Sequence, residues 1–110
     1  MANDGCCASE SPLACDLGAI SADDRPRYHE LRHAVGASVV GKRELPDGLA
    51  VQIDTARIGL PQLAEWISFE RKCCPFFEFR IDLAPGSGPV WLSLTGRAGV
   101  KEFITEAFAV

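Results

Sequence analysis

The sequence lacks the features that would tie the protein to a membrane, to export or to nucleic acid. No apolar run approaches the roughly 20 residues that a membrane-spanning helix needs. Residues 1–4 lack the basic and apolar regions of a secretory signal, so we expect a cytoplasmic protein. The 11 basic residues are scattered among 15 acidic ones, and the net charge of −4 argues against nucleic acid and against an anionic membrane as partners.

Cysteine, in contrast, is abundant. The chain has 5 cysteines in 110 residues, and structural disulfides explain them poorly in a reducing compartment. Cys6, Cys7 and Cys15 lie in a first segment without a periodic apolar pattern, which predicts a flexible tail over residues 1–20. A single domain is expected over residues 21–110. Metal binding or redox chemistry is therefore the leading account of the cysteines.

Hydrophobic periodicity predicts an α+β fold for this domain. The expected elements are a helix over 23–36, strands over 39–45 and 49–54 joined by Pro46-Asp47-Gly48, a helix over 61–74, strands over 77–83 and 90–94, and a last helix capped by Thr95. A hairpin followed by a helix thus occurs twice. This α-ββα-ββα order predicts a two-layer fold, a four-stranded antiparallel sheet with helices on one face, without fixing the strand order.

The segment Glu70-Arg71-Lys72-Cys73-Cys74-Pro75-Phe76 is the strongest candidate site. On a helical wheel Cys74 falls on the apolar face and Cys73 at its edge, while Glu70 falls in the middle of that face. A carboxylate there is costly unless it is paired, protonated or bound to an ion. Because Glu70 precedes the two cysteines by three and four residues, the three side chains can converge across one helical turn.

Two adjacent cysteines rarely form a relaxed disulfide with each other, so binding one soft ion or bridging to other cysteines is the easier use. Thiolates select Cu(I) or Zn(II), and by the same softness Hg(II) or As(III), over hard ions. We therefore expect Glu70, Cys73 and Cys74 as metal ligands. Cys6, Cys7 and Cys15 are further candidate ligands, placed to capture or deliver the ion.

A plain structural role competes with this hypothesis. Free cysteine is among the most buried residue types, so Cys73 and Cys74 can simply close a helix against the Phe-rich strand that follows. Cys15 can equally be a core residue beneath Leu13, Leu17 and Ile20.

Four segments together resemble a family of small, uncharacterised bacterial proteins marked by a Cys-Cys-Pro-Phe motif. They are residues 70–76, Cys15-Asp16-Leu17-Gly18-Ala19-Ile20, Arg43-Glu44-Leu45-Pro46-Asp47-Gly48, and Pro89-Val90-Trp91-Leu92-Ser93-Leu94-Thr95-Gly96. The resemblance covers the chain from about residue 13. It implies an association with genes for resistance to mercury and other heavy metals, and hence another metal-resistance protein as a partner. It implies no established activity.

A second motif, His29-Glu30-Leu31-Arg32-His33, matches the H-E-x-x-H pattern in which two histidines hold Zn(II) and the glutamate acts as a base. Val39 occupies the position at which the extended motif has a third histidine. The wheel also separates both histidines from the apolar positions of this helix. A zinc metallopeptidase-like site at His29, Glu30 and His33 is therefore an alternative, and a solvated polar helix face is the simpler interpretation.

Two further alternatives use other features. Two thiols and a carboxylate are similar to the set with which organomercurial lyases act, so Glu70, Cys73 and Cys74 can be the catalytic residues of a thiol-dependent enzyme acting on organometal compounds. The protein can also be an interaction module with Trp91 on an open sheet face.

Overall fold

The computed structural model describes residues 16–107, with side-chain surroundings described as far as Ile104. The elements are a short 3-10 helix η2 (Leu17–Ala19), α1 (Arg25–Ala37), β1 (Val39–Leu45), β2 (Gly48–Ile53), α2 (Leu60–Cys73), β3 (Glu78–Leu83), β4 (Val90–Thr95) and α3 (Val100–Ala107). The α-ββα-ββα order predicted from the sequence is confirmed. No helix in the described part of the chain is both long and apolar enough to span a membrane.

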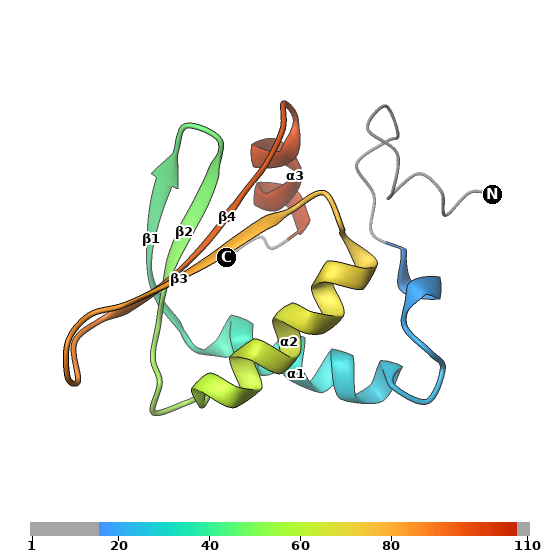
Figure 1. Ribbon diagram of the computed structural model, residues 1–110, viewed down its shortest axis with the longest axis horizontal. Helices are drawn as coiled ribbons and strands as arrows, with labels where there is room; N and C mark the ends of the chain where they lie inside the picture. Colours follow the sequence, from blue (N-terminus) through green and yellow to red (C-terminus); the bar gives the residue numbers. More distant parts are fainter. Residues whose placement is uncertain (1–15, 108–110) are drawn as a thin grey trace.

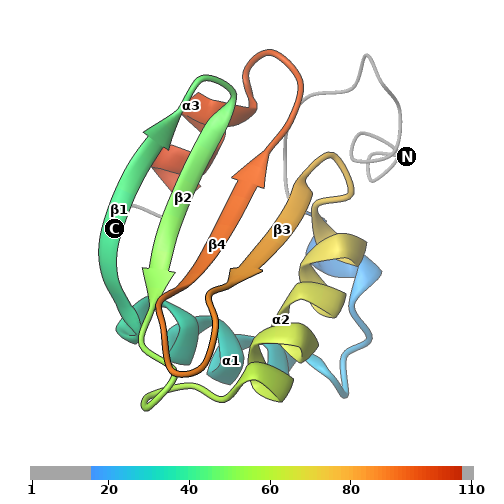
Figure 2. The same cartoon turned by 60° about the vertical axis from the view of Figure 1, so that its left-hand side comes forward.

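The four strands form one antiparallel sheet in the order β1-β2-β4-β3 (Figure 2). Each hairpin contributes one central strand and one edge strand, so β2 and β4 lie side by side in the middle. Pairing of β2 with β4 joins the two hairpins, with Val51 opposite Leu92. This long-range pairing supplies the strand order that local periodicity does not contain.

The helices cover one face of the sheet, as Figure 1 shows. Apolar side chains from both layers meet there in a single core: Tyr28, Leu31 and Val35 of α1; Leu63, Trp66 and Phe69 of α2; Val100 and Ile104 of α3; and Val51, Ile53, Leu92 and Leu94 of the sheet. Because side chains alternate along a strand, the intervening residues lie on the uncovered face. The predicted two-layer arrangement is therefore present.

The start of the last helix differs from the prediction. Thr95 does not cap α3, because it is the last residue of β4 and pairs with both Gly48 and Glu78. The chain then turns at Gly99, which has a φ of 94°, a value that glycine adopts readily and other residues rarely do. The helix begins at Val100. Sheet pairing thus overrides the capping tendency of a threonine.

The segment Asp16–Ile20, which we expected within the tail, lies against the end of α2. The backbone N–H of Asp16 donates a 2.8 Å hydrogen bond to the carbonyl oxygen of Cys73. The Asp16 side chain caps η2 by accepting from the N–H of Gly18 at 3.0 Å, and Ile20 is 1% exposed in the core. Cys6, Cys7 and Cys15 lie outside the described residues.

Candidate metal centre

The position of α2 is set at both of its ends. At the start, the backbone N–H of Gly59 donates to Oε1 of Gln62 at 2.8 Å, and Pro61 occupies the first turn, where no intrahelical donor is required. At the other end Pro75 disfavours helical geometry for Cys74, which has φ −131° and ψ 72°. The Cys74 N–H still donates to the Glu70 carbonyl at 2.6 Å. This last contact keeps Cys74 beside the final helical turn.

Glu70 is fully buried at this end of α2, with 0% of its surface exposed. The hydroxyl of Tyr28, on α1, donates a 2.7 Å hydrogen bond to Oε2 of Glu70. The other carboxylate oxygen, Oε1, is buried without a hydrogen-bond partner among the described residues. This oxygen therefore has no described donor at hydrogen-bond distance, although the Trp66 indole lies near enough to lower the pKa of the group.

Burial dominates the electrostatics of the site. It raises the pKa of Glu70 above its usual value, while the Tyr28 hydrogen bond, the charge of Arg32 and the Trp66 indole pull that pKa downward. The pKa of Tyr28 is raised as well, first by burial and then by the negative charge on Glu70. A negative charge on Glu70 is therefore costly here, and a bound cation would offset that cost.

Cys73 and Cys74 complete a group of three ligands around this carboxylate. Both cysteines are 0% exposed, and their Sγ atoms are 3.8 Å apart. One ligand atom from each of Glu70, Cys73 and Cys74 lies within 4.8 Å of the other two, a cluster that can hold a metal ion. Cys73, which the wheel placed at the edge of the apolar face, is fully buried, and residues 16–20 lie against this end of α2.

The two cysteines differ in oxidation state. Cys73 is not disulfide-bonded, whereas Cys74 takes part in a disulfide bond. Reduction of this bond is required before both thiolates can bind one ion.

The H-E-x-x-H motif lies on the exposed side of α1. His29, Glu30 and His33 are all exposed, and Glu30 forms a 3.2 Å ion pair with Arg27. The ring of His29 lies 5.3 Å from that of Tyr28. Within residues 16–104, no third ligand joins the two histidines, since Glu70, Cys73 and Cys74 are the one group of three that meets the geometry.

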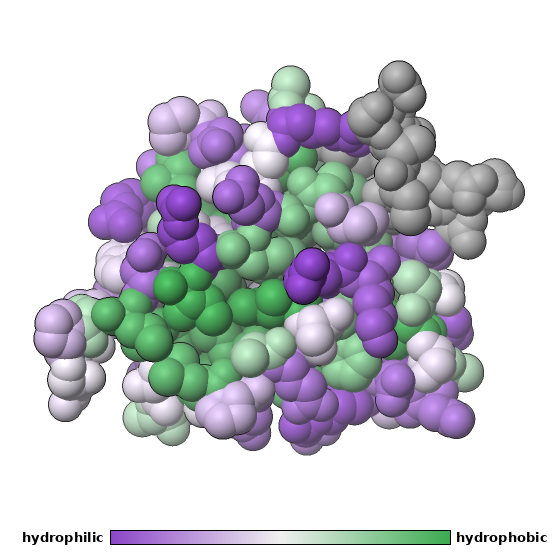
Figure 3. Space-filling view, viewed as in Figure 1, coloured by the Kyte–Doolittle hydropathy of each residue, from purple (hydrophilic) through white to green (hydrophobic). Residues whose placement is uncertain are grey.

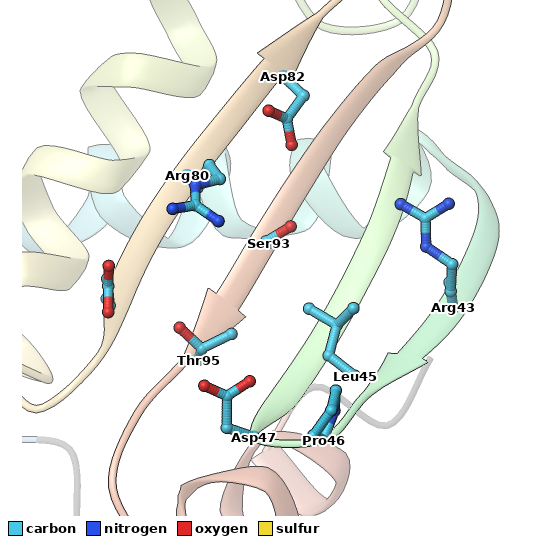
Figure 4. A pocket seen from close by; sticks show the side chains of 9 residues that line it. Arg43, Leu45, Pro46, Asp47, Arg80, Asp82, Ser93 and Thr95 are labelled. Carbon is cyan, nitrogen blue, oxygen red and sulfur yellow. The ribbon is translucent and has the colours of Figure 1, made fainter.

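A polar pocket of about 410 Å³ opens on the uncovered face of the sheet (Figure 4). Two basic side chains and three acidic ones line it, so neither sign of charge prevails. They are Arg43, Arg80, Asp47, Glu78 and Asp82. Trp91 is on this face, as expected, but it is half-buried beneath Arg43, whose guanidinium carbon lies 4.4 Å from the ring centroid. This face offers neither a strong field nor a bare aromatic surface.

Sequence reasoning missed Tyr28 as a site residue. Tyr28 was assigned to the apolar face of its helix with Leu31 and Val35, and all three are buried as expected. A buried phenol needs a partner for its hydroxyl, and Glu70 was the other polar group assigned to an apolar helix face. The pair could have been proposed by matching these two unsatisfied groups.

Comparison with known protein families, curated proteins and solved structures finds no match to this chain. Function is therefore inferred from side-chain chemistry alone.

Proposed function

We propose that the reduced protein binds one soft, thiophilic metal ion through the thiolates of Cys73 and Cys74, with Glu70 as the third ligand. The observation that carries this proposal is the buried Oε1 of Glu70, which has no described hydrogen-bond partner. A bare carboxylate oxygen beside two buried thiols is an unfavourable arrangement for an apolar core. Cation binding gives this oxygen a partner and offsets the negative charge of the two thiolates.

The donor set narrows the choice of ion. Two thiolates exclude hard ions, and Zn(II), Cu(I), Hg(II) and As(III) remain. Thiolates bound at about 2.3 Å with a tetrahedral angle between them stand about 3.8 Å apart, whereas a linear ion would separate them by about 4.6 Å. With Cys74 disulfide-bonded and no ion bound, the two Sγ atoms are 3.8 Å apart, so a three- or four-coordinate ion would need little rearrangement of the two sulfurs once the disulfide is reduced.

Burial suggests what such binding is for. Ligands with 0% exposure exchange slowly with solvent, which suits holding an ion more than rapid turnover. Cys6, Cys7 and Cys15 would pass the ion in or out by thiol exchange. In the cytoplasm, and in the metal-resistance context that the family resemblance implies, a second resistance protein would be the donor or acceptor of the ion.

Metal titration of the full chain tests this proposal. Reduced protein is titrated anaerobically with Zn(II), Cu(I), Hg(II) and As(III) in separate runs, and free thiols and bound metal are counted at each step. We expect one tightly held ion that protects two thiols, and a disulfide-containing sample that fails to bind it. Cys73→Ser/Cys74→Ser should abolish this site, and Glu70→Gln should weaken it by at least roughly tenfold.

The matched control is Cys6→Ser/Cys7→Ser/Cys15→Ser, which removes every other thiol and should keep one ion. Equal binding by the wild type and by Cys73→Ser/Cys74→Ser would overturn the proposal. A wild type whose thiols stay fully reactive towards every ion would also overturn it, and would favour a purely structural or interaction role.

A thiol-dependent enzyme is the second candidate, favoured by the raised pKa of Glu70 beside two thiols. In such a reaction both thiolates would hold Hg(II) while the carboxylic acid transfers its proton to the departing carbon, so the carbon–mercury bond breaks and a hydrocarbon leaves. Gas chromatography of reduced protein mixed with an organomercurial tests this candidate. Absence of hydrocarbon above the level of Cys73→Ser/Cys74→Ser eliminates it.

A further inference from the structure

The strand β3 forms one edge of the sheet and presents a row of backbone groups to solvent. The N–H of Ala84 donates to the Pro89 carbonyl at 3.2 Å, directly beyond the Leu83–Val90 pair that ends the β3–β4 ladder. Hydrogen-bonded pairs alternate along an antiparallel ladder, so the even residues of β3 bond to β4. The N–H and C=O groups of Phe79, Ile81 and Leu83 therefore point away from the sheet.

Apolar side chains line this edge on the helix-covered face. Phe79 and Ile81 are half-buried, and Leu83 is 58% exposed, the largest value among the exposed large hydrophobic residues described. A groove of about 650 Å³ runs between the edge and α2, lined by Ala64, Ile67, Arg71, Phe77, Glu78, Phe79 and Ile81. In Figure 3, apolar side chains gather over the region where β3 passes the first half of α2.

The opposite face of β3 carries alternating charges, Glu78, Arg80 and Asp82, all on the uncovered side of the sheet. Figure 4 shows Arg80 and Asp82 projecting from the same face of the strand. When the strand runs antiparallel to a second copy and is offset so that Arg80 faces Asp82, this alternation of charge places unlike charges opposite each other.

We propose that two copies of this chain pair antiparallel through β3, with Ile81 opposite Ile81 of the second copy. Phe79 then lies opposite Leu83 of the second copy, and the outward backbone groups of all three residues find partners. On the uncovered face Arg80 lies opposite Asp82 of the second copy, twice by symmetry. The exposed Leu83 enters the apolar groove beside α2 of the other copy.

Neighbouring registers are less favourable. In the proposed dimer the two-fold axis passes through the Ile81 pair. An axis at Arg80 would instead place Arg80 opposite Arg80 and Glu78 opposite Asp82 of the second copy, and like charges directly opposite each other are destabilising. Moving it to Phe79 leaves only residues 78–80 of the two strands facing each other. The axis at Ile81 pairs residues 79–83 and opposes unlike charges.

The other edge strand is less suited to pairing. The β1–β2 register shifts between Val39 and Gly41, and β1 carries Lys42 and Arg43 in succession. Bulges and lysines are devices that keep an edge strand from adding another strand. The register of β3 against β4 is unbroken. The contrast supports β3 as the edge that pairs.

Sedimentation equilibrium of the full reduced chain, at about 10 to 200 µM and low salt, tests the dimer. We expect the wild type to dimerise. Arg80→Asp should weaken the dimer roughly tenfold, because two attractive pairs become repulsive, and Lys42→Asp on the other edge should leave it unchanged. A monomeric wild type, or an Arg80→Asp protein that dimerises as well as the wild type, overturns the proposal.

Charge exchange identifies the register. With the axis at Ile81, Arg80→Asp/Asp82→Arg restores both unlike pairs, so the double variant should match the wild-type dimer. With the axis at Arg80 it should instead dimerise more tightly than the wild type, because Asp82→Arg would then face Glu78. Arg80→Asp and Asp82→Arg, each weakened alone, should form a heterodimer when mixed. This mixture also shows that both single variants fold. Failure of the double variant and of the mixture to recover association overturns the register.

Discussion

The hydroxyl of Tyr28 donates a 2.7 Å hydrogen bond to the Oε2 atom of Glu70, joining α1 to the last turns of α2 inside the core. The two residues are 42 positions apart in the sequence. This contact gives one oxygen of the buried carboxylate a donor and leaves the other available. It is the point at which the packing of the two helices and the chemistry of the candidate metal centre meet.

Loss of this donor should destabilise the fold. Tyr28→Phe keeps the ring but leaves Glu70 with one donor fewer, so we expect the free energy of unfolding to fall by about 1 to 3 kcal/mol. Urea unfolding of reduced, chelator-treated protein at neutral pH measures it. The same substitution in a Glu70→Gln background should cost less, because a neutral acceptor forms a weaker hydrogen bond. Equal costs in the two backgrounds would contradict this coupling.

Glu70 should also make the metal-free protein less stable as the pH rises. Its pKa is raised in the folded state, so the protonated carboxyl favours folding, and that stability is lost as the pH climbs from about 4.5 through the raised pKa. Glu70→Gln stays neutral and lacks this loss. Urea midpoints across this range should therefore fall for the wild type relative to Glu70→Gln. A constant difference between the two curves would show that the carboxyl ionises normally.

Two glycines provide a matched test of the sheet. A Cβ at Gly48 would lie 1.9 Å from the carbonyl oxygen of Leu94 on β4, a backbone atom that cannot move aside. Gly48→Ala should therefore cost about 1 to 3 kcal/mol or more. A Cβ at Gly36, in α1, meets nothing within 4 Å, so Gly36→Ala should stabilise by up to about 1 kcal/mol. Thermal unfolding distinguishes them, and an unchanged Gly48→Ala protein would contradict the close pairing of β2 with β4.

The sequence allowed the elements and the misplaced carboxylate to be predicted because both are local. Helical spacing alone put Glu70 among apolar positions, and its burial follows from α2 packing on the sheet. The strand order and the contact with Tyr28 join distant segments, which periodicity does not encode. The full burial of Cys73 was not predictable for the same reason, because the segment of residues 16–20 that lies against this end of α2 is distant in sequence. Thr95 was misassigned because a capping residue is also a good strand residue.

A second contact between α1 and α2 lies on the molecular surface, and it should respond to acid. Arg27 donates to both carboxylate oxygens of Glu65, at 2.8 and 3.1 Å, and this lowers the pKa of Glu65 below its usual value of about 4.5. A depressed pKa means that the stabilisation is present above pH 4.5 and disappears as the pH falls through the lowered value.

Glu65→Gln should therefore lower the thermal midpoint at neutral pH, and the wild type should approach it in acid. Glu30→Gln is the control, because Glu30 makes a single contact with the same arginine and its side chain is 70% exposed. It should have the smaller effect. The difference should also shrink at high salt, since both partners of the Arg27–Glu65 pair are partly exposed. If the thermal midpoints of the wild type and Glu65→Gln differed by the same amount at every pH from neutral to 3, this surface pair would not hold the helices together.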